Sequence, residues 1–234
     1  MEAHRSVLSV TQTWKSAYPG ASAGVLAMGR VANPESSPEL DAHKIALEAD
    51  LRSAFGALDR NQLKSHPLIA PYTAYYKRFD KTYHVQHQLE SIVFKGKTLP
   101  RAAALIEAMF MAELRNMLLT AGHDLDSVRG YPILDVATGT ETYSMLSGRQ
   151  QTLKHGDMFI HDEEGILSSV IYGPDHRTRI TPVTTQVLFT VYAPAGVPPH
   201  RVRAHLGDLE DLVLAVSPEA QVQYNAIVEA GPEG

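Results

Sequence analysis

The stretch from residue 130 to 194 most narrows the folds open to this chain, because glycines recur along it at intervals of 8 or 9 residues. Gly139, Gly148, Gly156, Gly165 and Gly173 separate short runs in which polar side chains alternate with β-branched or aromatic ones. Period-two alternation interrupted by glycine is typical of short strands joined by tight turns. The sequence therefore predicts a meander of short strands that ends in a Thr-rich strand over residues 184–194.

Helical patterns precede this meander. Ser36 and Glu39 have capping-box spacing with a proline between them, which predicts a helix over residues 37–58. Apolar residues at helical spacing predict further helices over residues 67–79, 83–94, 100–120 and 217–229. Gly122 is the expected stop of the fourth of these five helices. The small-residue run 24–29 predicts a buried strand.

Length and composition predict one α+β domain over residues 1–234. We expect its core over about residues 24–200 and a helical C-terminal tail over residues 201–234. With 44% hydrophobic and 20% charged residues, the chain has enough apolar side chains for a sizeable core. Short, mostly antiparallel strands covered by helices are the expected architecture.

Charge and composition exclude several classes of protein. The chain has no cysteine, which excludes disulfides, thiol nucleophiles and Cys-ligated zinc. Its formal net charge of −5 argues against coating of DNA or RNA through general phosphate attraction. No apolar run reaches the roughly 18 residues of a membrane-spanning helix, and no signal peptide is recognisable. We expect a cytoplasmic protein with no DNA partner, no membrane contact and no cofactor.

Motifs of common catalytic sites are absent or incomplete. Gly96-Lys97-Thr98 resembles the end of a phosphate loop, but Ser91 stands where that motif requires glycine. No Gly-x-Ser-x-Gly elbow is present, and the scattered Ser, His and Asp residues define no catalytic triad. The sequence alone therefore identifies no nucleophile.

Two polar groups permit a functional and a structural interpretation. His84, His87 and Glu90 recur at three-residue spacing on one predicted helix, which suits two metal ligands but suits a solvated helix face better. We therefore predict no metal site. His123 and Asp124 follow a predicted helix end, where they either form a polar site or satisfy terminal carbonyl groups.

The order of short motifs over about residues 100–194 resembles one known family. The chain has Asp124, Gly130, then Thr140-Glu141, Leu146-Ser147-Gly148, Phe159-Ile160-His161-Asp162, Val170-Ile171-Tyr172-Gly173, and a strand from Thr184 to Ala193-Pro194. This succession is similar to the B3/B4 domain of the phenylalanyl-tRNA synthetase β chain, which hydrolyses mischarged tRNA. The resemblance implies a layered ββα domain that stands free of a synthetase catalytic core, so the chain is not expected to be a complete tRNA ligase.

The resemblance also implies the ligand and the site. The expected partner is tRNA or the 3′ end of aminoacyl-tRNA, and the expected reaction is deacylation in trans by a positioned water, with no protein nucleophile. The substrate-binding positions carried over are Ala121, His123, Asp124, Glu141, Tyr172, Gly173 and Thr190. Arg177 and Arg179 are expected to contact RNA phosphate.

Departures from the family pattern leave other functions open. Ala121 stands where the synthetase domain has a histidine, and Thr190 falls where that domain has a glutamate that binds the tyrosine hydroxyl. A neutral hydroxyl is a weaker acceptor than a carboxylate, which puts the rejection of tyrosine in doubt. A non-catalytic module that binds RNA or an amino acid is therefore an alternative, as is a regulatory partner of another enzyme.

Overall fold

The computed structural model describes residues 8–231 and has a mixed α+β fold. Within these residues lie seven α-helices and three sheets, whose strands pair antiparallel except for β1 and β4. The helices are α1 (Gln12–Ala17), α2 (Pro38–Phe55), α3 (Arg60–Lys64), α4 (Ala70–Lys77), α5 (His84–Lys95), α6 (Ala104–Asn116) and α7 (Pro199–Val216). The expected α+β architecture with mostly antiparallel short strands is confirmed.

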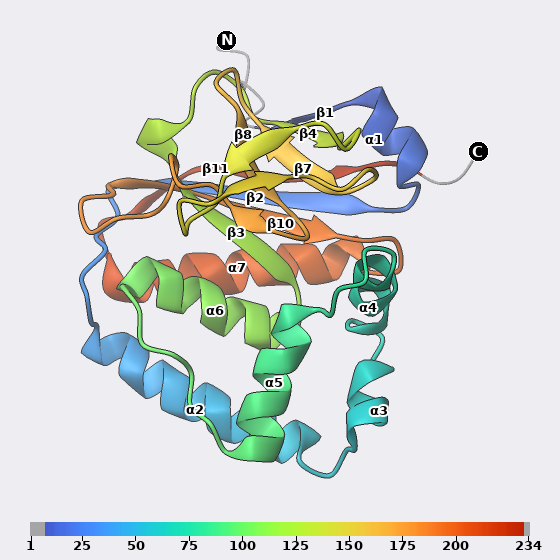
Figure 1. Ribbon diagram of the computed structural model, residues 1–234. Coiled ribbons are helices and arrows are strands. Elements are labelled where there is room, and N and C mark those ends of the chain that lie inside the picture. The colour runs from blue at the N-terminus through green and yellow to red at the C-terminus, as the bar shows by residue number, and fades with distance from the viewer. Residues whose placement is uncertain (1–7, 232–234) are drawn as a thin grey trace.

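A four-stranded sheet forms the middle layer. Its strands, in spatial order, are β11 (Gln221–Glu229), β2 (Ser22–Gly29), β10 (Gln186–Ala193) and β3 (Leu119–Asp124). Every residue of β2 is buried, because the sheet is covered on both faces. Figure 1 shows α6 and α7 on one face and the second sheet on the other.

Apart from β1, the strands of the second sheet and of a small hairpin come from the glycine-punctuated region. The five-stranded sheet contains β1 (Ser9–Val10), β4 (Ile133–Val136), β7 (Met158–His161), β8 (Ile166–Ser169) and β9 (Gly173–Pro174) in that order. The hairpin pairs β5 (Thr142–Ser144) with β6 (Gln150–Thr152). The predicted meander of short strands is therefore confirmed.

Helices form the outer layers. Helix α6 packs beside α7, while α2 packs against α5, α6 and α7 and lies farther from the sheets (Figure 1). The helices predicted over residues 37–58, 67–79 and 83–94 correspond to α2, α4 and α5. The N-cap of α2 is Ser37 rather than Ser36, since the Ser37 hydroxyl accepts the Leu40 N–H at 3.4 Å.

Helix α6 ends earlier than predicted. The expectation that the helix runs to residue 120 and stops at Gly122 is wrong. Met117 adopts a left-handed conformation with φ 57° and ends the helix, although it is not a glycine. Gly122, His123 and Asp124 therefore lie in β3, where pairing with β10 outweighs the local helical pattern.

The prediction of a helix over residues 217–229 is also wrong. The expected helical tail is helical in α7, but Gln221–Glu229 forms strand β11, which pairs with β2 along its whole length. Val222, Tyr224, Ile227 and Val228 are residue types that favour a strand. This pairing covers an edge of β2 that would otherwise be open.

Tyrosines of α4 fasten the helices to the ends of both sheets. Tyr72 donates to the Tyr192 carbonyl at 2.6 Å and stacks on Tyr83 with ring centroids 4.4 Å apart. Tyr76 donates to the Val170 carbonyl at 2.7 Å. These contacts fix the corner between α4, β10 and the residues that follow β8. None of the helices in the described range is long and apolar enough to cross a bilayer.

Candidate functional site

The open edge of strand β3 is the feature around which the candidate site is built. β3 pairs with β10 on one side, and no strand within residues 8–231 pairs with it on the other. The N–H of Thr120 donates to the Glu113 carboxylate and the N–H of Asp124 donates to the Thr178 carbonyl, each at 2.7 Å. Since backbone direction alternates along a strand, the N–H and C=O of Gly122 also point away from β10.

A cavity of about 370 Å³ lies along this edge. It is bounded by α6, the start of α5, strands β3 and β9, the residues around the end of β8, and the chain from 173 to 180. Its lining is mostly apolar and consists of His84, Ile106, Met109, Phe110, Glu113, Leu119, Thr120, Ala121, Gly122, Leu146, Ser169, Val170, Gly173, Pro174, Arg179, Ile180 and Tyr192. A concave apolar pocket with a few polar groups is the usual form of a small-ligand site.

Glu113 is the acidic group of the cavity lining. Its side chain is buried, with 1% of the residue exposed, and one carboxylate oxygen accepts the Thr120 N–H. Among the described residues no cation lies within ion-pair distance of it. Burial therefore raises the pKa of Glu113 to about 8, so that the carboxyl group is mostly protonated at neutral pH.

The other titratable groups of the lining differ in charge. Burial, reinforced by the nearby His87, lowers the pKa of His84 to about 4, so its ring is neutral, and its Nδ1 lies 3.3 Å from the Tyr76 hydroxyl. Arg179 is exposed and donates to the His176 carbonyl at 2.7 Å. The cavity thus has a neutral interior and one permanent cation in its lining.

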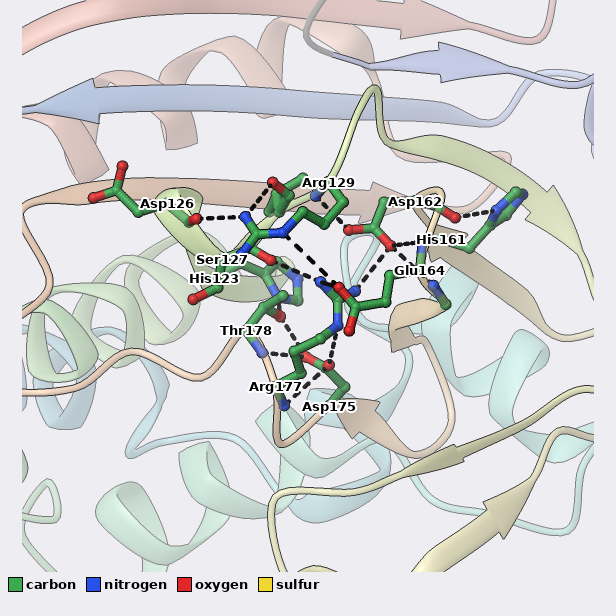
Figure 2. A network of polar contacts seen from close by, with 12 residues as sticks. His123, Asp126, Ser127, Arg129, His161, Asp162, Glu164, Asp175, Arg177 and Thr178 are labelled. Carbon is green, nitrogen blue, oxygen red and sulfur yellow. Dashed lines mark hydrogen bonds and ion pairs between the residues drawn. The ribbon is translucent and has the colours of Figure 1, made fainter.

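A buried ion-pair network holds one wall of the cavity (Figure 2). Arg177 donates to Asp162 at 2.8 Å and to the Ser127 carbonyl at 2.7 Å, and it lies 3.6 Å from Glu164 and 3.8 Å from Asp175. Only 25% of its side chain is exposed, and that of Asp162 is fully buried. Arg177 therefore anchors the segment that carries Gly173, Pro174, Arg179 and Ile180 into the lining.

His123 links this network, through Thr178, to the cavity-lining residue Tyr192, through Ser168. Its Nδ1 lies 2.8 Å from the Thr178 hydroxyl and its Nε2 lies 3.2 Å from the Ser168 hydroxyl. Ser168 in turn lies 2.6 Å from the hydroxyl of Tyr192, a lining residue. Burial and the charge of Arg177 lower the pKa of His123 to about 3, so it acts as a neutral hydrogen-bonding link between the two sheets.

The residues predicted to bind substrate or RNA phosphate separate into two groups. Ala121, Gly173 and Arg179 line the cavity, and Tyr172 stands next to Gly173 with its ring 5.8 Å from the Lys81 ammonium. The others lie outside the lining. His123 and Arg177 are committed to the network behind the wall.

Asp124, Glu141 and Thr190 also lie outside the lining. Asp124 accepts from Thr184 at 2.7 Å and from the Asp126 N–H at 3.0 Å, which is a capping role. Thr190 is fully buried opposite Ala121 in the sheet, and its hydroxyl has no hydrogen-bond partner among the described residues.

Glu141 closes its own turn. Burial alone would raise its pKa, but hydrogen bonds from the Thr138 hydroxyl and from the N–H groups of Thr138, Gly139 and Thr140 lower the pKa of Glu141 to about 2. Its carboxylate thus stabilises the loop between β4 and β5.

The candidate metal ligands do not converge. Nδ1 of His84 lies 3.3 Å from the Tyr76 hydroxyl, and Nδ1 of His87 lies 3.9 Å from the Glu90 carboxylate. Within residues 8–231 no three histidine or acidic side chains gather in an arrangement that could hold a metal ion.

Glu113 is the site residue that the sequence interpretation missed. It lies four residues after Met109 and one after Ala112, on the side of the helix that the apolar pattern assigns to the core. A carboxylate on such a stripe is unusual unless it is paired. A glutamate at this position of the apolar helix face was therefore the signal in the sequence that could have identified the site residue.

The chain is distantly similar to the phenylalanine–tRNA ligase β subunit, which confirms the resemblance drawn from the order of motifs. It is 36% identical to that subunit of Mycoplasma genitalium over 69 residues, which is 30% of this chain and 9% of the ligase subunit. The crystal structure of an N-terminal fragment of the β subunit from Pyrococcus horikoshii aligns with 94% of this chain and 53% of the fragment, at 11% identity and a TM-score of 0.48. No family model matches the chain. The chain thus spans a small part of the ligase subunit.

Proposed function

We propose that this protein binds the aminoacylated 3′ end of a tRNA in the cavity beside β3 and hydrolyses the ester in trans. The observation that carries the proposal is an apolar cavity of about 370 Å³ along a strand edge, lined by Gly122 with its N–H pointing away from β10, in a chain similar to a tRNA ligase subunit. The cavity is large enough for an amino-acid side chain and the adjoining ester.

The strand edge supplies the chemistry that deacylation needs. An ester carbonyl placed against the Gly122 N–H would be polarised, and the same donor would stabilise the oxyanion that forms when water attacks. Gly122 has no Cβ, and an added Cβ would lie 2.8 Å from the Ile180 methyl group and 3.3 Å from the Met109 sulfur. A side chain at this position would therefore displace the Ile180 and Met109 side chains that line the cavity, and glycine avoids this.

Contact with RNA in this proposal rests on Arg179. Arg177 is engaged by Asp162 and the Ser127 carbonyl, whereas Arg179 is exposed and lines the cavity. A guanidinium in that place is suited to a phosphate of the tRNA terminus. With a formal net charge of −5, the chain needs such a local cation for RNA to approach.

Binding without hydrolysis is a second candidate, and one observation favours it. The described lining offers little acid–base machinery. The Thr120 hydroxyl lies 2.7 Å from Nε2 of His205, which is fully buried and outside the lining. His84 is neutral with a pKa lowered to about 4, and Ser169 accepts a hydrogen bond from the Tyr172 N–H at 3.0 Å. Hydrolysis would then depend on a water and on the ribose hydroxyl of the RNA. Such a site retains orientation and oxyanion stabilisation but lacks protein acid–base catalysis.

A panel of mischarged tRNAs tests both candidates. Each tRNA is incubated with the protein and loss of the ester is followed, alongside a binding measurement at low and moderate salt. We expect ester loss with the wild type, slower loss with Gly122→Ala, and weaker binding with Arg179→Ala. Arg203→Ala, an exposed arginine of α7 outside the lining, serves as the matched control. Binding without ester loss would support the second candidate, and no binding of any tRNA would contradict both.

A further inference from the structure

Glu113 differs from the other buried carboxyl groups of the described chain in what surrounds it. Glu107, six residues earlier on the same helix, pairs with Lys44 at 2.8 Å, and Asp162 pairs with Arg177 at 2.8 Å. Asp157, which has no cation partner either, accepts from the Tyr75 hydroxyl at 2.7 Å and from the Ile171 N–H. From the residues that the structure describes, Glu113 receives a single hydrogen bond, from the Thr120 N–H, and no cation lies within ion-pair distance of it.

The second oxygen of Glu113 belongs to the cavity. The Thr120 N–H reaches Oε1, and no hydrogen bond among the described residues reaches Oε2. Since Glu113 lines the cavity, a bound molecule can reach this oxygen. A buried carboxyl group is costly to maintain without a partner. A ligand is the partner that the cavity leaves room for.

The spacing along β3 between Thr120, which holds the Glu113 carboxylate, and Gly122 matches the size of one class of ligand. Successive residues of a strand are about 3.3 Å apart, so the N–H groups of Thr120 and Gly122 lie about 7 Å from each other. An ammonium group on Glu113 and a carbonyl on the Gly122 N–H, each at about 2.9 Å, fit that span when one carbon separates them. That spacing is found in an α-amino acyl group.

We propose that Glu113 binds the α-ammonium group of the aminoacyl ligand, while its carbonyl lies on the Gly122 N–H and its side chain lies against the apolar wall of Ile106, Met109 and Phe110. This inference rests on the proposed function in taking an aminoacyl group as the ligand. It adds the ammonium subsite and the consequence of filling it.

Binding of an ammonium group releases a proton. Because burial raises the pKa of Glu113 to about 8, the carboxyl group of the empty site holds its proton at pH 6.5. The ammonium group favours the carboxylate, so this proton passes to solvent while the ligand keeps its own. One proton is released per ligand bound, and affinity rises with pH until the ligand amine itself deprotonates near pH 8.

The other titratable groups around Glu113 do not change their protonation state when the ammonium group binds. They are Tyr72 and Tyr76 of α4, Tyr83 and His84 at the start of α5, Tyr192 of β10, His205 of α7 and Arg179. Burial raises the pKa of each of these buried tyrosines and lowers the pKa of His84 and of His205 to about 4. All six are therefore neutral at pH 6.5, and Glu113 is the group that titrates on binding.

The test compares L-phenylalaninamide with 3-phenylpropanamide, which lacks the amino group, by titration calorimetry at pH 6.5. Each ligand is titrated in two buffers of different ionisation enthalpy, so that proton release is measured directly. We expect the amine to bind at least about tenfold more tightly, the ratio for a charge-assisted hydrogen bond, with one proton released. Glu113→Gln should lose both the preference and the release, whereas Glu210→Gln, outside the lining on α7, should keep both.

Each other outcome overturns the inference. Equal affinity of the two ligands, no proton release by the wild type, an unchanged Glu113→Gln variant, or no binding of either ligand would each exclude the ammonium subsite. Since neither ligand contains RNA or an ester, the result is independent of the tRNA panel. Hydrolysis without amine preference removes this inference alone, and amine preference without hydrolysis removes the deacylase alone.

Discussion

Replacing Glu113 by glutamine should change how the stability of the protein depends on pH. In the wild type the Thr120 N–H donates to the Glu113 carboxylate at 2.7 Å. Glutamine keeps an oxygen that can accept this hydrogen bond and removes only the ionisation of the side chain. Burial raises the pKa of Glu113 from an ordinary value of 4.5 to about 8 in the folded protein. The folded state therefore binds this proton more tightly than the unfolded state does.

The size of the effect follows from proton linkage. Stabilisation from the raised pKa is fully present below pH 4.5 and is lost as the pH rises through 8. Between those values the free energy of unfolding falls by about 1.4 kcal/mol per pH unit because of this one group. The wild type should thus lose up to about 5 kcal/mol that Glu113→Gln does not lose, with about 4 kcal/mol of it lost by pH 8.

Urea denaturation of both proteins at pH 5, 6, 7 and 8 measures this difference. The two proteins should differ by less than about 1 kcal/mol at pH 5, and Glu113→Gln should be more stable by several kcal/mol at pH 8. Groups such as His84 and His205 titrate equally in both proteins, so the difference isolates Glu113. Parallel stability curves over this range would refute the assignment of a buried, unpaired carboxyl group.

The remaining predictions concern the wall and the backbone of the cavity. Arg177→Ala should lower the free energy of unfolding by about 3 kcal/mol, because it leaves Asp162 buried without its cation. Arg179→Ala should change the free energy of unfolding by less than about 0.5 kcal/mol. Equal urea midpoints of the two variants would contradict this contrast. Gly122→Ala should fold, with a thermal midpoint within a few degrees of the wild type, yet bind L-phenylalaninamide at least about tenfold more weakly, and unchanged affinity would place the ligand elsewhere. Gly207→Ala in α7 should raise stability by about 0.5–1 kcal/mol, since the added Cβ meets no atom within 4 Å, and a loss in urea denaturation would show strain there.

Much of the architecture could be predicted because local signals and tertiary structure agree. Glycine spacing and period-two alternation identify the strands between β4 and β9, and the Ser-Pro-Glu signal identifies the start of α2 to within one residue. The boundary of α6 could not be predicted, since Met117 adopts a left-handed conformation that favours glycine and the apolar pattern continues into β3. Strand β11 was missed because its pairing with β2 comes from residues nearly 200 positions away.

The candidate site shows the same division. Ala121, Gly173 and Arg179 were expected near a ligand and line the cavity. Arg177 could not be separated from Arg179 by sequence, because its partner Asp162 is known only from the folded chain. Glu113 was detectable in principle, since a carboxylate stood on an apolar helix face, but its lack of a partner is a tertiary property.

An aminoacyl terminus should bind along the edge of β3. An NMR titration of the ¹⁵N-labelled protein with 3′-deoxy-3′-(L-phenylalanylamino)adenosine, whose amide resists hydrolysis, locates it. The amide signals of Thr120 and Gly122 on β3 should shift, together with those of Gly173 and Arg179 across the cavity. Shifts confined to other surfaces, or no shift at millimolar ligand, would contradict binding at the β3 edge.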